Sequence, residues 1–219
     1  SEMCIRDSPY TGEVDDTRIA HLAFGVEERH DDNLIRSGRN WFGTRLSSLG
    51  ANTKSWNISI PGAIAGQEAT IEFAAAMRTT GSGSGSELVY AWEGQTLSLT
   101  DNLLSPSSLA FAGYRSGAMT AQLTQPGLQV LATLNPGTDD SNAWMDYLAY
   151  QVPQSLVFSG GQMAINGLPV DGDGNSVEGA QYLLGGNQAP DAVWDVTDPL
   201  DVHDLPLAVL DGALSWSSS

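Results

Sequence analysis

Apolar and polar residues alternate at every second position along most of this chain, which is the pattern of half-buried β-strands. In the segment 20–26, one side carries apolar residues and the other His21, Gly25 and Glu27; the apolar residues are Ala20, Leu22, Phe24 and Val26. The same alternation recurs in the segments 56–60, 71–77, 119–123 and 128–134. Each of these segments predicts one strand of a sheet with a core on one side.

The segment 143–152 is apolar on both faces, apart from Asp146 and Gln151. This predicts a central strand covered on both sides, ended by Pro153, because proline cannot donate to a strand ladder. Shorter apolar runs at 156–158, 163–165 and 193–196 predict further strands, and turn residues such as those at 81–86, 126–127 and 135–137 separate the segments. Together these features predict an all-β fold, a jelly-roll-like antiparallel β-sandwich with little helix.

Residues 1–8 differ in character from the rest of the chain and resemble a translated adapter sequence. We therefore expect them to be a leader foreign to the fold. This leader contains Cys4, the single cysteine of the chain, so no internal disulfide is available.

The net charge of the chain indicates which classes of partner to expect. The 219 residues include 26 acidic and 9 basic side chains, a formal net charge of −17. Such a surface repels phosphate backbones and anionic lipid, so we expect no nucleic-acid partner. No stretch of about 18 apolar residues occurs, so we also expect no membrane span.

Nucleophilic catalysis needs an activated Ser, Cys or Thr beside a base. The histidines are His21, His30 and His203, which we expect on the surface, and no Gly-x-Ser-x-Gly elbow is present. We therefore assign no catalytic residue to this chain.

Two kinds of ligand stay open at this stage. Asp171, Asp173 and Asn175 occupy the first three side-chain positions of a calcium loop, but Ser176 and Tyr182 break the rest of that pattern. The same residues suit an exposed turn. An aromatic platform for a glycan is the other candidate: Trp56, Trp92 and Trp144 lie in apolar strand patterns and predict core, whereas Trp41 and Trp216 do not.

Three separated motifs resemble one family. Residues 37–43 read Ser-Gly-Arg-Asn-Trp-Phe-Gly, residues 142–147 read Asn-Ala-Trp-Met-Asp-Tyr, and residues 193–199 read Val-Trp-Asp-Val-Thr-Asp-Pro. Their order and spacing are similar to the region before the catalytic domain in type IX secretion sortases, members of the gingipain family of cysteine peptidases. The motif residues that carry this resemblance are Ser37, Gly38, Arg39, Trp41, Phe42, Gly43, Trp144, Asp146, Tyr147, Trp194, Asp195 and Asp198.

The resemblance implies a non-catalytic β-sandwich accessory domain in residues 9–200, followed in 201–219 by a truncated linker toward a catalytic domain that is absent here. It implies structural or interdomain roles for the motif residues. It also implies a location at the cell surface or outer membrane of a Gram-negative bacterium, with type IX secretion components and cargo proteins as partners. Apart from the calcium that Asp171, Asp173 and Asn175 leave open, we expect no cofactor. The alternative is a free-standing extracellular binding or adhesion module of another secreted protein, with glycan or calcium as ligand.

Overall fold

The computed structural model describes residues 2–5, 17–34, 40–105, 108, 110–158, 160–165, 180–186, 188–196, 198, 200–210 and 213–218. The chain divides into two compact units. The sandwich unit comprises Phe24–Pro61 and Ala65–Val152, and the terminal unit comprises Ser1–Ala23, Gly62–Ile64 and Pro153–Ser219. The described residues contain strands and no helix, and so no helix that is long and apolar enough to span a membrane.

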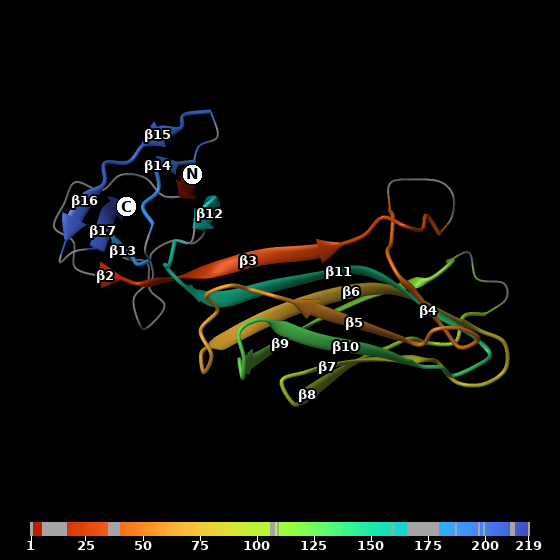
Figure 1. Ribbon diagram of the computed structural model, residues 1–219. Coiled ribbons are helices and arrows are strands. Elements are labelled where there is room, and N and C mark those ends of the chain that lie inside the picture. The colour runs from red at the N-terminus through yellow and green to blue at the C-terminus, as the bar shows by residue number, and fades with distance from the viewer. Residues whose placement is uncertain are drawn as a thin grey trace. The chain divides into compact units, whose positions relative to one another are not determined.

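Two sheets build the sandwich unit (Figure 1). The first sheet runs in the order β3 (Ala20–Glu28), β11 (Asp140–Ser155), β6 (Glu68–Thr80) and β9 (Gly113–Gln122), and β4 (Arg45–Ser47) also pairs with β11. The second sheet runs in the order β5 (Thr53–Ile58), β10 (Leu128–Asn135), β7 (Glu87–Trp92) and β8 (Gln95–Thr100). The chain crosses between the sheets at most connections, and strand pairs such as β6–β9 and β10–β7 are antiparallel. The predicted all-β sandwich is confirmed.

The core lies between these two sheets and follows the period-two pattern. On β6, the alternate residues Ile71, Phe73, Ala75 and Met77 are fully buried. The Phe73 ring stacks on Tyr90 of β7, with ring centroids 3.7 Å apart. Such apolar contacts between inner faces hold two sheets together, because each face alone would expose its apolar side chains to water.

Strand β11 is central, as predicted, since it lies between β6 on one side and β3 and β4 on the other. Its predicted end at Pro153 is wrong, because β11 continues to Ser155. Pro153 is tolerated there because its carbonyl oxygen accepts a hydrogen bond from the amide of Ile64, at 2.9 Å, and a carbonyl contact needs no N–H.

Strand β3 turns its apolar side outward. Leu22, Phe24 and Val26 are 44%, 53% and 48% exposed, respectively. Their side of the strand is set by Gly25, because the ring of Tyr150 occupies the space that a Cβ at Gly25 would need. For the same reason His21, which alternates with Leu22, is half-buried rather than on the surface, and burial lowers the pKa of its imidazole.

Within its described residues, the terminal unit holds two small sheets that include parallel pairs. One runs in the order β12 (Gln162–Ile165), β1 (Glu2–Ile5), β14 (Ala192–Asp195) and β15 (His203–Asp204), and the other in the order β16 (Ala208–Leu210), β17 (Ala213–Ser218), β13 (Ala180–Leu184) and β2 (Thr17–Arg18). Its buried cluster consists of Leu156, Phe158, Ile165, Tyr182, Leu184, Val193 and Leu205.

The unit boundaries differ from the expected division at residues 8 and 200. Residues of the expected leader form β1, and residues of the expected linker form β15, β16 and β17. The strands that come after Pro153 are short and build a core of their own, so the residues 9–200 divide between two units.

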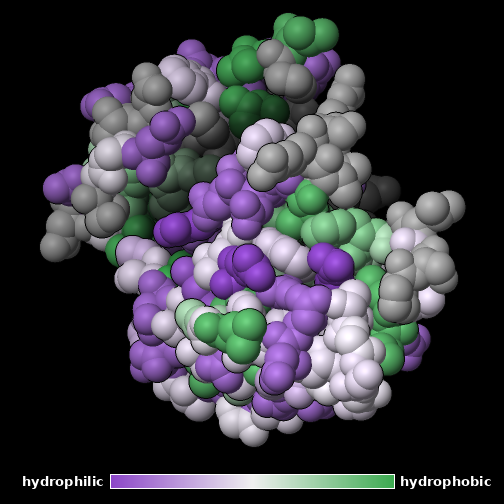
Figure 2. Space-filling view, turned by 90° about the vertical axis from the view of Figure 1, so that its right-hand side faces the viewer, coloured by the Kyte–Doolittle hydropathy of each residue, from purple (hydrophilic) through white to green (hydrophobic). Residues whose placement is uncertain are grey.

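The surface agrees with the composition. On the face seen in Figure 2, hydrophobic residues gather in separate groups among hydrophilic and intermediate ones. That pattern fits a strongly acidic chain, which solvates most of its surface.

Candidate binding site

The first two family motifs meet on the outer face of the first sheet. Phe42 is buried in a cluster with Ala76 of β6 and Trp144 of β11. The backbone beside it is also tied down, since the Gly43 amide donates to the Met145 carbonyl at 2.7 Å and the Met145 amide donates to the Thr44 carbonyl at 3.1 Å. The residues 42–44 therefore form a rigid cover over the middle of β11.

A β-bulge in β11 places the acidic residue of the second motif. Met145 pairs with Ala75 and Leu148 pairs with Phe73, so two residues of β11, Asp146 and Tyr147, lie opposite the single residue Ala74 of β6. Met145 and Leu148 both stay buried although they are three positions apart. The bulge thus keeps the core pattern and turns Asp146 to the outer face, where the Tyr114 hydroxyl donates to its Oδ2 at 2.6 Å.

A cavity of about 430 Å³ lies beside this bulge. We call it the aromatic cavity, and the residues that line it are Glu28, His30, Asn40, Trp41, Phe42, Tyr114 and Asp146. Trp41 and Tyr114 are 45% and 52% exposed, whereas the neighbouring Phe42 is buried. The aromatic cavity therefore combines two accessible aromatic side chains, Trp41 and Tyr114, with the buried side chain of Phe42.

The electrostatics of the aromatic cavity are acidic. Glu28 and Asp146 contribute carboxylates, and Glu28 Oε1 lies 2.8 Å from Nε2 of His30. Burial raises the pKa of Tyr114, and the hydrogen bond to Asp146 and the negative charges of Asp146 and Glu28 raise it further. Tyr114 is therefore a neutral hydrogen-bond donor at physiological pH.

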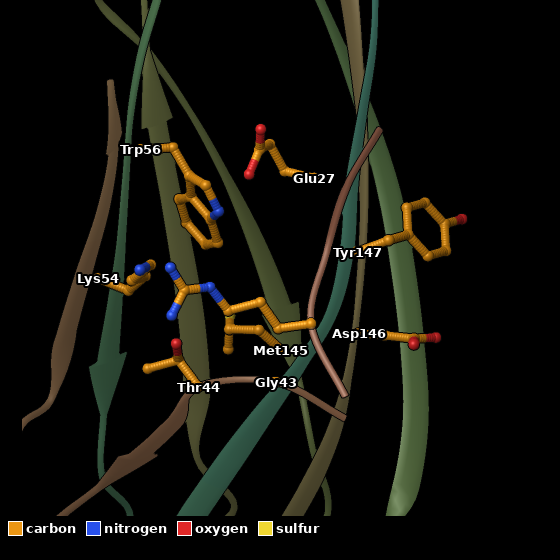
Figure 3. Close-up of a pocket in the computed structure, with 9 residues that line it drawn as sticks. Glu27, Gly43, Thr44, Lys54, Trp56, Met145, Asp146 and Tyr147 are labelled. Atoms are coloured by element: carbon orange, nitrogen blue, oxygen red, sulfur yellow. The ribbon is translucent and has the colours of Figure 1, made fainter. Parts of the chain in front are cut away.

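A smaller cavity, of about 50 Å³, opens on the other side of the bulge (Figure 3). In Figure 3, Asp146 and Tyr147 point away from Trp56 and Lys54. The Lys54 ammonium lies 5.7 Å from the centroid of the Trp56 ring, within the range of a cation–π contact. A space of this volume holds a few waters at most, so we do not regard it as a site for an organic ligand.

The other predicted site residues fall into two groups. Ser37, Gly38, Arg39, Asp171, Asp173 and Asn175 lie outside the described residues. The third motif lies in the terminal unit, where Asp195 is buried, Trp194 is half-buried and Asp198 is exposed. Asp198 shapes a turn there, since its Oδ1 accepts a hydrogen bond from the Leu200 amide at 2.9 Å. Across the described parts of the chain, no three His, Cys, Asp or Glu side chains are grouped to hold a metal ion.

Sequence patterns did not point to Glu28 or Tyr114 as site residues, and Asn40 entered only as a member of the first motif. Tyr114 lies 32 positions from Asp146, and only the pairing of both β11 and β9 with β6 brings the two side chains together. A single sequence carries no local signal for such a contact. Trp41, which we singled out as a candidate platform, does line the cavity.

Comparisons with known proteins show a similarity of fold to solved structures and no match in sequence families. No family model and no curated protein matches the chain. A crystal structure of dimeric latent PorU from Porphyromonas gingivalis superposes with a TM-score of 0.76 at 16% identity, covering 97% of this chain and 20% of that one.

Other solved structures match more loosely. A family 35 carbohydrate-binding module from Cellvibrio japonicus has a TM-score of 0.34 at 14% identity, covering 60% of this chain and 91% of that one. The family 35 module from Clostridium thermocellum has a TM-score of 0.29 at 14% identity, covering 60% of this chain and 90% of that one. The chain therefore has a PorU-like, all-β fold and spans about one fifth of the length of the PorU structure.

Proposed function

We propose that this chain is a non-catalytic β-domain of a cell-surface sortase or cysteine peptidase that processes cargo of the type IX secretion system. The observation that carries the proposal is the likeness of fold to PorU, which extends over 97% of the chain and hence over residues of both units. The chain matches about one fifth of the PorU structure, as expected for an accessory domain that forms one part of a larger protein.

The packing of the motifs supports the same proposal. Phe42 and Gly43 of the first motif lie against Trp144 and Met145 of the second, so residues about 100 positions apart in sequence form one structural element. In the proposed function these residues stabilise the sandwich, and the Cys-His chemistry belongs to a catalytic domain further along the same polypeptide. The protein would lie outside the cytoplasm, at the outer membrane of a Gram-negative cell.

The gene itself tests this proposal. We expect the reading frame that encodes Ser219 to continue into an α/β domain with a histidine and a later cysteine. A stop codon soon after Ser219, or a series of similar β-modules, would instead favour a free-standing binding or adhesion module.

A biochemical experiment tests the inactive role of this chain. The purified 219-residue chain should hydrolyse neither peptide nor ester substrates, and the chain extended through the next domain should cleave a peptide that carries a type IX secretion signal. Replacing the cysteine of that next domain with alanine should abolish the cleavage. Hydrolysis by the 219-residue chain alone would contradict the proposal.

A further inference from the structure

We infer that the aromatic cavity is a binding site for a neutral saccharide, with Trp41 as the stacking platform and Asp146 and Glu28 as acceptors for sugar hydroxyls. The inference rests on the cavity of the sandwich unit and does not depend on the proposed function.

The aromatic side chains supply the apolar half of such a site. A pyranose ring presents C–H groups on its faces and hydroxyls around its edge, so it needs an accessible apolar plane with polar groups beside it. Trp41 is 45% exposed at the cavity, although a tryptophan usually contributes more to stability when it is buried. Tyr114 adds a second aromatic surface and comes from β9, a different part of the chain.

The polar side chains supply the other half. Asp146 accepts one hydrogen bond from Tyr114, which fixes its carboxylate, and an ionised carboxylate has further acceptor positions. Glu28 and Asn40 also line the cavity, so acceptors and an amide donor stand beside the aromatic rings. Vicinal sugar hydroxyls donate to a carboxylate in the same way that two donors of one guanidinium do.

Charge selects among saccharides. Two carboxylates line the aromatic cavity, and the chain carries a net charge of −17. A uronate or a phosphorylated sugar would bring a further negative charge close to these two carboxylates, and like charges repel. The site therefore favours neutral sugars over anionic ones.

Size and rigidity agree with this ligand class. The cavity volume of about 430 Å³ falls within the range of roughly 300–1,000 Å³ that is typical of small-molecule sites, and it greatly exceeds the space that a bound ion needs. Trp41 directly precedes Phe42 and Gly43, which are anchored to β11. Because this anchoring already restricts the backbone beside Trp41, binding a sugar should cost less conformational entropy.

Titration calorimetry of the whole chain with cellohexaose, xylohexaose and mannohexaose tests the inference, with polygalacturonate as the anionic probe. We expect at least one neutral oligosaccharide to bind with a dissociation constant in the micromolar to millimolar range, and polygalacturonate to bind at least tenfold more weakly. Trp41→Ala should weaken binding of the neutral sugar at least tenfold. Asp146→Asn, which keeps an acceptor for Tyr114, should weaken it several-fold.

Phe111→Ala is the matched control, because Phe111 is a partly exposed aromatic residue of the sandwich unit that does not line the cavity. The Phe111→Ala variant should bind the neutral oligosaccharide with the affinity of the wild type. Circular dichroism should show that Trp41→Ala, Asp146→Asn and Phe111→Ala are all folded. Absence of heat with every neutral oligosaccharide, stronger binding of polygalacturonate, or equal affinity of folded Trp41→Ala would each overturn the inference.

Discussion

Gly117→Ala tests the packing of the two sheets that define the sandwich. Gly117 lies on β9, and a Cβ placed there would lie 2.9 Å from Cδ2 of Leu97, 3.3 Å from Cδ2 of Leu99 and 3.3 Å from Cε2 of Phe73. Carbon atoms prefer separations of about 3.5–4.0 Å, so the closest neighbour must move by roughly 0.6 Å. Phe73 and Leu99 are buried and have little freedom to move, whereas Leu97 is only half-buried.

Two opposing terms set the expected magnitude. Replacing glycine by alanine inside a strand normally stabilises a protein by about 0.5–1 kcal/mol, because glycine loses more backbone entropy on folding. Overpacking of a close-packed core costs about 1–3 kcal/mol. We expect the second term to exceed the first, so the free energy of unfolding should fall by about 1–2 kcal/mol.

Urea unfolding followed by far-UV circular dichroism measures this change. Gly50→Ala is the matched control, because the nearest atom to its added Cβ is Cβ of Ser47 at 3.8 Å, an ordinary contact. In the double variant Gly117→Ala/Leu97→Ala, the loss should be smaller than the sum of the two single losses by about 1 kcal/mol, since the removed methyl groups free the space. Equal midpoints for Gly117→Ala and Gly50→Ala, or simple additivity in the double variant, would refute the packing that we describe.

Two further predictions concern a buried carboxylate and the cover over β11. Burial raises the pKa of Asp101 against the opposing charge of Arg115, so the folded state binds its proton more tightly than the unfolded state does. The contribution of Asp101 to stability therefore decreases as pH rises from the ordinary carboxyl pKa through the raised one. Urea titrations from pH 4 to 7 should show that Asp101→Asn loses this pH dependence. If the free energy of unfolding of the variant changed with pH as steeply as that of the wild type, the prediction would be contradicted. Phe42→Ala removes a buried ring and should lower the free energy of unfolding by about 3–5 kcal/mol. Hydrogen exchange should then show faster exchange of the Gly43 and Met145 amides, and unchanged protection there would count against the role of Phe42 as an anchor.

The family motifs show how far a resemblance in sequence extends. Residues 37–39 of the first motif and residues 171–175 of the candidate calcium loop fall outside the described chain, so their predicted roles stay predictions. Trp144 is buried, as the apolar strand pattern predicts, but on the outer face of the first sheet rather than between the sheets. The sequence pattern predicts burial without predicting which layer provides it.

Local alternation by itself determined the strands, because side chains on a strand point to opposite faces at successive positions wherever the strand lies. The segments 56–60, 71–77 and 128–134 therefore predicted β5, β6 and β10 from nearest neighbours alone. The net charge of −17 likewise led us to expect no nucleic-acid partner, and that stays a prediction.

Tertiary structure alone decided which side of β3 faces water, where β11 bulges and which residues share the aromatic cavity. Each of these depends on contacts between distant positions, such as the Tyr150 ring over Gly25 and the Tyr114 hydroxyl on Asp146. The free energy of such a contact depends on both residues of the pair. The pattern along one strand includes only one of those two residues. The physical reason is that strand geometry is local, whereas sheet order and side-chain packing are not.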